Sequence, residues 1–255
     1  MQDAESESPV CGDTYAKVFM NEEGLEIFAA FENEAHPNAS NVARARIVDD
    51  LLREELAACP DLFVLTIGAG FDSRPYRLTG GTWVELDERA VISYKNEQLT
   101  VTECPNELHR IPIDFSTESV KEKLSPFAER ESPVVIVVEG VFVYLDEPNI
   151  RQLLQMLKSV FPQHMLIGDM TSKRFFEEYG HDMHDKLKAL GTSFKYTPQD
   201  PESIFKENGY LRREKISVVG SAVKFGSIAM PPALLETVFR TLADGYSIYV
   251  FETGG

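Results

Sequence analysis

The feature that most constrains the fold is an apolar run that ends at two closely spaced glycines. Residues 62–67 are almost wholly apolar and are followed by Gly68 and Gly70. A second short apolar run ends at Glu85 and Asp87. This pattern is typical of a parallel α/β sheet that holds a nucleoside. The glycines let the backbone approach the ligand, and an acid after the next strand accepts the ribose hydroxyls.

Two common nucleotide-binding signatures are incomplete in this chain. The dinucleotide fingerprint has a third glycine, which allows close helix–strand packing, and Ser73 stands at that position. The sequence contains no Gly-x-x-x-x-Gly-Lys-Ser/Thr, so no P-loop is expected. S-adenosylmethionine has no phosphate, and its sulfonium and amino acid tail suit a neighbourhood rich in acids. We therefore expect S-adenosyl-L-methionine as cofactor, with a nicotinamide dinucleotide as the alternative.

Four segments, taken together, resemble the leucine carboxyl methyltransferase family. Residues 67–78 read Ile-Gly-Ala-Gly-Phe-Asp-Ser-Arg-Pro-Tyr-Arg-Leu and are similar to the family's Gly-Ala-Gly-x-Asp-Thr-Arg-x-x-Arg-Leu segment. Residues 43–52 resemble its Arg-x-Arg-x-x-Asp-Asp helix, and residues 84–95 its Glu-x-Asp-x-x-x-Val-Ile-x-x-Lys segment. Residues 138–145 resemble its Glu-Gly-x-x-x-Tyr-Leu segment. The chain departs from the family in having Ser for the usual Thr and Glu where Pro commonly follows the acid.

The resemblance implies a fold and an activity. The fold is the α/β class I methyltransferase (Rossmann-like) fold, a seven-stranded, mostly parallel sheet with helices on both faces and an N-terminal helical cap. The activity is S-adenosylmethionine-dependent O-methylation of a protein carboxyl terminus or of small molecules such as polyketides. We favour a carboxylate or hydroxyl of a small-molecule acceptor, because a chain with a formal net charge of −16 poorly suits an acidic protein tail. A non-catalytic S-adenosylmethionine-binding protein and a NAD-dependent oxidoreductase remain alternatives.

The charge and the cysteines indicate other properties. An excess of 16 acids argues against nucleic acid and against anionic membranes as partners. No apolar stretch reaches 18 residues, and the first eight residues are polar and acidic, which predicts neither a membrane span nor a signal peptide. Cys11, Cys59 and Cys104 are widely spaced, as in a reducing cytoplasm. The sequence carries no signal of oligomeric state.

Strands and helices alternate along the chain, which predicts a parallel sheet covered on both faces. The predicted strands are residues 62–68, 82–87, 108–115, 133–140, 165–170, 215–220 and 246–252. The predicted helices are residues 13–35, 40–58, 88–100, 147–161, 201–208 and 233–242, with a charged helical insertion at 172–190. We expect a disordered tail over residues 1–12 and one domain over 13–255. Within it, residues 13–60 form a lid and 172–210 an acceptor-side insertion.

Ligands of open α/β sheets bind at the carboxyl ends of the strands, so the candidate site residues follow predicted strands. Gly68 and Gly70 bring the backbone to the amino acid tail of the cofactor. Asp87 is the preferred acceptor for the ribose hydroxyls. Glu85 is close behind, because strand alternation points both side chains to the same face.

Further cofactor contacts are predicted from the other strand ends and from the resemblance. Asp114 is expected to accept the adenine amino group while Phe115 packs on the ring. Glu139 is expected to meet the ligand's ammonium. The resemblance assigns the ligand's carboxylate to an early arginine, Arg44 or Arg46, which can bind it bidentately.

The resemblance also places Asp72 and Arg74 in the cofactor segment, although Arg74 could instead form an ion pair with Asp72 or Asp87. A phenol or alcohol acceptor needs a base, for which Asp169, in the strand 165–170, and Tyr144 are the candidates. Tyr144 is the candidate that we select as the catalytic residue. Its alternative role is that of a packed aromatic. His181 and His184 lack further metal ligands, so no metal site is predicted.

Overall fold

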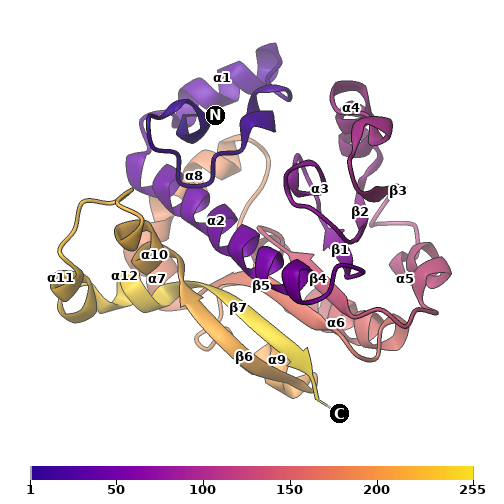
Figure 1. Ribbon diagram of the computed structural model, residues 1–255. Helices are drawn as coiled ribbons and strands as arrows, with labels where there is room; N and C mark the ends of the chain where they lie inside the picture. The colour runs from indigo at the N-terminus through magenta and orange to yellow at the C-terminus, as the bar shows by residue number, and fades with distance from the viewer. Residues whose placement is uncertain (1, 255) are drawn as a thin grey trace.

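The computed structural model describes residues 2–254, and its centre is a seven-stranded sheet (Figure 1). The strands are β1 (Phe63–Ile67), β2 (Thr82–Glu88), β3 (Glu107–Ile113), β4 (Val134–Val138), β5 (Met165–Thr171), β6 (Tyr210–Ser217) and β7 (Tyr246–Thr253). Their order is β3-β2-β1-β4-β5-β7-β6. β7 pairs antiparallel with both β5 and β6, and the other four pairs of neighbouring strands are parallel. The predicted mostly parallel sheet is confirmed.

Helices cover both faces of this sheet. They are α1 (Glu22–Phe31), α2 (Ala35–Ala58), α3 (Arg74–Arg77), α4 (Arg89–Gln98), α5 (Val120–Leu124), α6 (Glu147–Val160), α7 (Lys173–Phe175), α8 (His181–Ala189), α9 (Ser203–Glu207), α10 (Val218–Lys224), α11 (Pro232–Thr237) and α12 (Arg240–Gly245). Within residues 2–254, no helix has both the length and the apolar character needed to cross a membrane.

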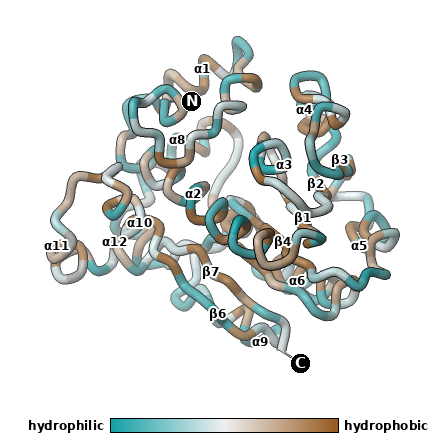
Figure 2. The backbone as a smooth tube through the Cα atoms, viewed as in Figure 1, coloured by the Kyte–Doolittle hydropathy of each residue, from teal (hydrophilic) through white to brown (hydrophobic). Residues whose placement is uncertain are grey.

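The two central strands explain this layered arrangement. All residues of β1 and β4 are buried, as expected for parallel strands covered on both faces, and both strands are hydrophobic in Figure 2. Phe63 and Leu65 belong to the core that includes α6, whereas Val64 belongs to the core that includes α2. The period-two alternation of β1 therefore holds α2 and α6 on opposite faces.

Three segments differ from the sequence predictions. The predicted strand 215–220 is wrong: β6 occupies Tyr210–Ser217, and the helix α10 begins at Val218. Residues 212–215 of β6 are charged and exposed because this strand lies at the sheet edge, so they lack an apolar signal. Predicted helix 13–35 is divided into a short 3-10 turn, Thr14–Lys17, and α1. Predicted helix 233–242 is divided into α11 and α12.

The first residues also differ from the expected disordered tail. Met1 lies outside the described residues, but Asp3 holds the segment that follows it. The Asp3 carboxylate accepts hydrogen bonds from the backbone N–H groups of Val10, Cys11 and Gly12 at 2.7, 3.0 and 2.9 Å. Residues 2–12 therefore form a closed loop beside the candidate site.

Candidate cofactor site

A cavity of about 370 Å³ lies at the carboxyl ends of β1 and β4. Its walls come from four parts of the chain: the N-terminal segment, α2, the segment from the end of β1 into α3, and Glu139 after β4. The lining residues are Asp3, Ala4, Cys11, Asp13, Ala16, Asn41, Val42, Arg44, Ala45, Thr66, Gly68, Ala69, Gly70, Asp72, Arg74, Arg77 and Glu139. The cavity thus lies where ligands of open α/β sheets bind.

The turn after β1 provides close access to its backbone. Gly68 has φ of +66°, and a Cβ there would lie 2.5 Å from Val141 Cγ2. Gly70 has φ of +48°, and a Cβ there would meet no atom within 4 Å. Any side chain at Gly70 would occupy space that the glycine leaves open. The Gly70 amide is held in place by Asp87, whose Oδ2 accepts its N–H at 2.6 Å.

Glu139 lies between two arginines at this cavity. Arg44 Nε donates to Glu139 Oε1 at 2.8 Å, and Arg74 Nη2 lies 2.9 Å from Glu139 Oε2. Burial acts to raise the pKa of the Glu139 carboxyl, but the charges of Arg74 and Arg44 outweigh it and hold that pKa below its ordinary value. The cavity wall therefore combines a carboxylate and a guanidinium. An amino acid zwitterion needs both charges, so these residues fit the tail of S-adenosylmethionine.

The Arg74 guanidinium forms ion pairs with three acids, Asp49, Asp72 and Glu139. Its side chain is 4% exposed, with Nε 2.7 Å from Asp49 Oδ1 and Nη1 2.9 Å from Asp72 Oδ2. Asp72 also accepts the Arg74 backbone N–H at 2.8 Å. Of the two predicted roles, the structure describes the ion pair that shapes the loop, with Asp72 and not Asp87 as partner. Asp49, a further partner, belongs to the Arg-x-Arg-x-x-Asp-Asp segment and was not predicted as a site residue.

Arg44 has two partners that the sequence analysis did not include in the cofactor site. Its Nη1 donates to the Tyr246 hydroxyl at 2.8 Å and lies 3.3 Å from Asp169 Oδ2. Asp169 follows the apolar start of β5, so a search for acids at strand ends finds it. Tyr246 begins the antiparallel strand β7, and no motif marks it. Arg46, the alternative to Arg44, instead pairs with Asp50 at 2.7 Å.

Glu85 is not brought to the cavity. Its carboxylate is buried between Lys95 Nζ and Arg110 Nε, each at 2.8 Å. Burial raises the pKa of Glu85, and the charges of Lys95 and Arg110 oppose that rise. The prediction failed because β2 extends to Glu88, so Glu85 lies below the rim of the sheet, where α4 and β3 cover it. Asp87 lies nearer the strand end, in contact with the glycine turn.

Asp114 and Phe115 follow β3 but do not line the cavity. The Asp114 carboxylate accepts hydrogen bonds from Ser116 N, Ser116 Oγ and Thr117 Oγ1 at 2.8, 2.5 and 2.7 Å. These bonds lower the pKa of Asp114 to about 2. Phe115 is exposed. Both residues therefore lie in a surface turn, and their predicted contacts with adenine stay predictions.

Tyr144 ends the 3-10 turn Phe142–Tyr144 after β4 and contacts the insertion between β5 and β6. Its ring meets Phe194 edge-on at 5.6 Å, and the Phe194 ring lies 5.5 Å from His184. His184 Nδ1 accepts the Phe194 N–H at 3.2 Å, so this ring supports the insertion. Partial burial raises the pKa of Tyr144. A protonated phenol at neutral pH is a hydrogen-bond donor rather than a base.

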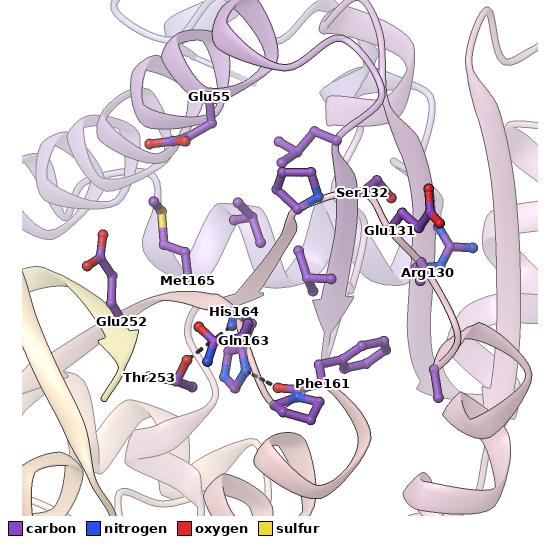
Figure 3. Close-up of a pocket in the computed structure, with 16 residues that line it drawn as sticks. Glu55, Arg130, Glu131, Ser132, Phe161, Gln163, His164, Met165, Glu252 and Thr253 are labelled. Atoms are coloured by element: carbon purple, nitrogen blue, oxygen red, sulfur yellow. Dashed lines mark hydrogen bonds between the residues drawn. The ribbon is translucent and has the colours of Figure 1, made fainter. Parts of the chain in front are cut away.

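A larger cavity, about 620 Å³, opens at the opposite edge of the sheet, where β4 and β5 begin (Figure 3). His164 Nδ1 there donates to the Phe161 carbonyl oxygen at 2.6 Å, and His164 N donates to Thr253 Oγ1 at 3.3 Å. These groups are engaged in the fold. Because ligands of parallel sheets bind at the carboxyl ends of the strands, we assign no site to this cavity.

Comparison with solved structures gives the class of protein. The fold is similar to a DUF574 family protein from Streptomyces avermitilis, with a TM-score of 0.58, 15% identity, and coverage of 94% of this chain and 95% of that chain. It is also similar to magnesium protoporphyrin IX methyltransferase from Synechocystis, solved with S-adenosylhomocysteine (TM-score 0.52, 14% identity, coverage 95% and 94%). The chain therefore has the class I methyltransferase fold, as predicted.

Sequence comparison gives the family. The family model for leucine carboxyl methyltransferase matches residues 1–158, and the chain belongs to this family. A putative S-adenosyl-L-methionine-dependent methyltransferase of Frankia alni is 28% identical over 76% of this chain and 69% of its own length. The tetracenomycin polyketide synthesis O-methyltransferase TcmP of Streptomyces glaucescens is 23% identical over 77% of this chain and 70% of its own. The protein is an S-adenosyl-L-methionine-dependent methyltransferase, which excludes the oxidoreductase alternative.

Proposed function

We propose that this protein methylates a carboxylate or hydroxyl oxygen of a small molecule. The observation that carries the proposal is the cavity at the ends of β1 and β4, where the Gly68–Gly70 turn faces the Arg44–Glu139 pair. The polyketide O-methyltransferase TcmP, a relative of similar length, supports a small-molecule acceptor. The formal charge of −16 argues against a nucleic acid substrate.

Residues at and beside the cavity have distinct roles in this proposal. Arg44 holds the carboxylate of the cofactor's amino acid tail, and Glu139 holds its ammonium. The backbone of Gly68 and Gly70 lies beneath the tail. Asp87 accepts the ribose hydroxyls, since a carboxylate that takes two backbone N–H bonds retains lone pairs for further bonds.

Asp114 and Phe115 are proposed to contact the adenine at the end of β3. Asp72 and Arg74 are proposed to act on the cofactor indirectly, by shaping the loop beyond the glycine turn.

When bound, S-adenosyl-L-methionine supplies a methyl group already activated by the sulfonium charge. The residues of the chain therefore need only to position the acceptor and exclude water. A carboxylate acceptor needs no base at neutral pH, whereas a phenol does. Tyr144, whose pKa is raised by burial, is proposed to donate a hydrogen bond that orients the acceptor oxygen.

The acceptor-side elements and the cellular location are also proposals. Residues 172–210 and the N-terminal helices are proposed to select the acceptor, because Lys186 of α8 pairs with Glu34, just before α2, and so joins the insertion to the N-terminal helices (Figure 1). Cys11, Cys59 and Cys104 are free thiols, which supports a reducing, cytoplasmic environment.

The cofactor assignment is tested by isothermal titration of the protein with S-adenosylmethionine, S-adenosylhomocysteine and NAD. We expect micromolar-range binding of the two sulfur nucleosides and none of NAD. Asp87→Ala should raise the Kd of both sulfur nucleosides by at least about tenfold, since it removes a charged acceptor from the ribose and from the Gly70 amide.

Glu88→Ala is a matched control, because it removes the next acid along β2, which is exposed. Tighter binding of NAD than of either sulfur nucleoside would contradict the proposal. Binding of both nucleosides without methyl transfer to any carboxylate or phenol in a broad panel would favour a non-catalytic binding protein.

A further inference from the structure

Arg44 is joined to the far half of the sheet by two residues, Asp169 at the end of β5 and Tyr246 at the start of β7. The Tyr246 hydroxyl accepts from Arg44 Nη1 at 2.8 Å and donates to Asp169 Oδ2 at 3.1 Å. Asp169 Oδ2 also lies 3.3 Å from Arg44 Nη1. The three groups form a closed triangle, so each hydrogen bond restrains the other two.

The triangle is also tied to the loop after β4. Asp169 Oδ1 accepts the backbone N–H of Gly140 at 2.5 Å. Gly140 has φ of +67°, and a Cβ there would lie 3.4 Å from Arg44 Nη2. Asp169 therefore holds the Arg44 guanidinium next to Gly140. Gly140 directly follows Glu139, which carries the other charge of the cavity wall.

The surroundings of Tyr246 bury these contacts in part: Asp169 is buried, Tyr246 is half-buried and the Arg44 side chain is 22% exposed. The Phe175 ring at the start of the insertion lies 6.0 Å from the Tyr246 ring. Gly245 lets Phe175 approach, since a Cβ at position 245 would lie 2.4 Å from Phe175 Cβ. Ser172 N donates to the Gly245 carbonyl oxygen at 2.8 Å and fixes this approach. Hydrogen bonds to a charged group in such a partly buried setting contribute more than they do at the surface.

An unrestrained arginine samples many rotamers, and holding it in one of them costs conformational entropy when a ligand binds. Here the Nε edge of Arg44 is held by Glu139 and Nη1 by the other two groups. The restraint exists before any ligand arrives, so the ligand does not bear that entropy cost.

We propose that Asp169 and Tyr246 are positioning residues that pre-orient Arg44 for the amino acid tail of the cofactor. This inference rests on the proposed function, in which Arg44 binds the carboxylate of that tail. Tyr246 acts through Arg44 and Asp169 and does not itself touch the cofactor.

The test compares two ligands that differ in the tail. S-adenosylhomocysteine carries the amino acid, and 5′-methylthioadenosine retains the nucleoside and the sulfur but lacks the amino acid. In isothermal titration, Tyr246→Phe should raise the Kd of S-adenosylhomocysteine roughly fivefold, as expected for one lost hydrogen bond to a charged group. The Kd of 5′-methylthioadenosine should stay unchanged. Asp169→Asn should likewise raise the Kd of S-adenosylhomocysteine and leave the Kd of 5′-methylthioadenosine unchanged.

Two further variants separate the possible failures. Tyr249→Phe removes a second buried hydroxyl from β7, away from Arg44, and should leave both constants unchanged. Arg44→Lys keeps the charge but removes the planar fork, and should weaken only S-adenosylhomocysteine.

An effect of Arg44→Lys without one of Tyr246→Phe would overturn the positioning role and leave the proposed function intact. No effect of Arg44→Lys would overturn the role of Arg44 itself, and the inference with it. Equal weakening of both ligands by Tyr246→Phe would indicate a general structural effect and also overturn the inference.

Discussion

Asp49 is the residue on which the charged wall of the cavity depends. Its carboxylate is fully buried, with Arg74 Nε at 2.7 Å and Arg77 Nη1 at 2.5 Å. Burial acts to raise the pKa of Asp49, but hydrogen bonds and charges from Arg77 and Arg74 outweigh it, so the pKa lies below its ordinary value. Removing one member of such a buried group leaves uncompensated charge, which costs far more than losing a surface pair.

We therefore expect Asp49→Asn to lower the free energy of unfolding by about 3 kcal/mol at pH 7. A carboxyl whose pKa is depressed by folding stabilises the protein above the unfolded pKa of about 3.9, and that contribution is lost as pH falls toward the folded pKa. The difference between wild type and variant should shrink at acidic pH. Urea unfolding of both proteins at pH 7 and pH 3.5 measures it.

Asp50→Asn is the matched control, because Asp50 is the next residue of α2 and its side chain is 40% exposed. Its ion pairs with Arg46 and Arg53 are surface pairs, which contribute about 1 kcal/mol or less. Equal destabilisation by the two substitutions would show that the buried network does not have the role that we assign to Asp49.

Of the five predicted acids, Asp72 and Glu139 line the cavity, and the sequence pattern revealed a partner for Asp72 alone. The acid that ends a strand was predictable, since Asp87 does contact the glycine turn. Glu85, two residues earlier, has the same chemistry and the same strand face. Its cations, Lys95 and Arg110, come from a helix and a neighbouring strand, and only the fold brings them together. Long-range pairing of this kind leaves no local signal in one sequence.

At the scale of elements, the turn from β1 to α3 combines two glycines with different constraints. At Gly68 the backbone is left-handed, and Val141 already fills the space that a Cβ would need. At Gly70 the backbone is also left-handed but the space is open. One glycine is therefore required by the fold, and the other leaves room in the cavity.

Alanine substitution should separate these constraints. Gly68→Ala should lower the unfolding free energy by at least about 2 kcal/mol, from the left-handed backbone and the contact with Val141. Gly70→Ala should cost only about 1 kcal/mol, yet weaken S-adenosylhomocysteine binding more than tenfold, because the methyl group enters the cavity. Thermal unfolding and titration of both variants measure the two effects. Normal binding by Gly70→Ala would place the ligand elsewhere.

Element prediction succeeded where burial imposes a pattern and failed where it does not. The Val-Val-Ile-Val-Val run of β4 is buried on both faces, so its sequence is continuously apolar. The N-terminal half of β6 is an exposed edge, and its Arg212 and Glu214 flank an irregularity in the pairing with β7. Its existence depends on β7 as a partner, and single-sequence patterns do not report partners.

At the scale of the whole molecule, the cavity is lined in part by the N-terminal segment, which is distant in sequence from the β1–α3 turn. The loop held by Asp3 contributes to the cavity wall, and Asp13 Oδ1 accepts from Ser73 Oγ at 2.7 Å. The Phe19 ring stacks on Phe71 at 5.0 Å, just beyond the glycine turn. In Figure 1 the N-terminal segment lies at the top of the molecule, and the hairpin of β6 and β7 lies at the bottom.

Hydrogen–deuterium exchange with and without S-adenosylhomocysteine should show that a ligand in the cavity contacts this N-terminal segment. We expect slower amide exchange in residues 3–16, 41–45 and 66–74, which share the cavity although they are distant in sequence. Residues 128–134, at the opposite edge of the sheet, line the other cavity and provide the internal reference, where exchange should not change. Protection of 66–74 without protection of 3–16 would mean that the ligand binds beneath a segment that stays open. Protection confined to 128–134 would place the ligand in the opposite cavity and contradict the assignment of the site.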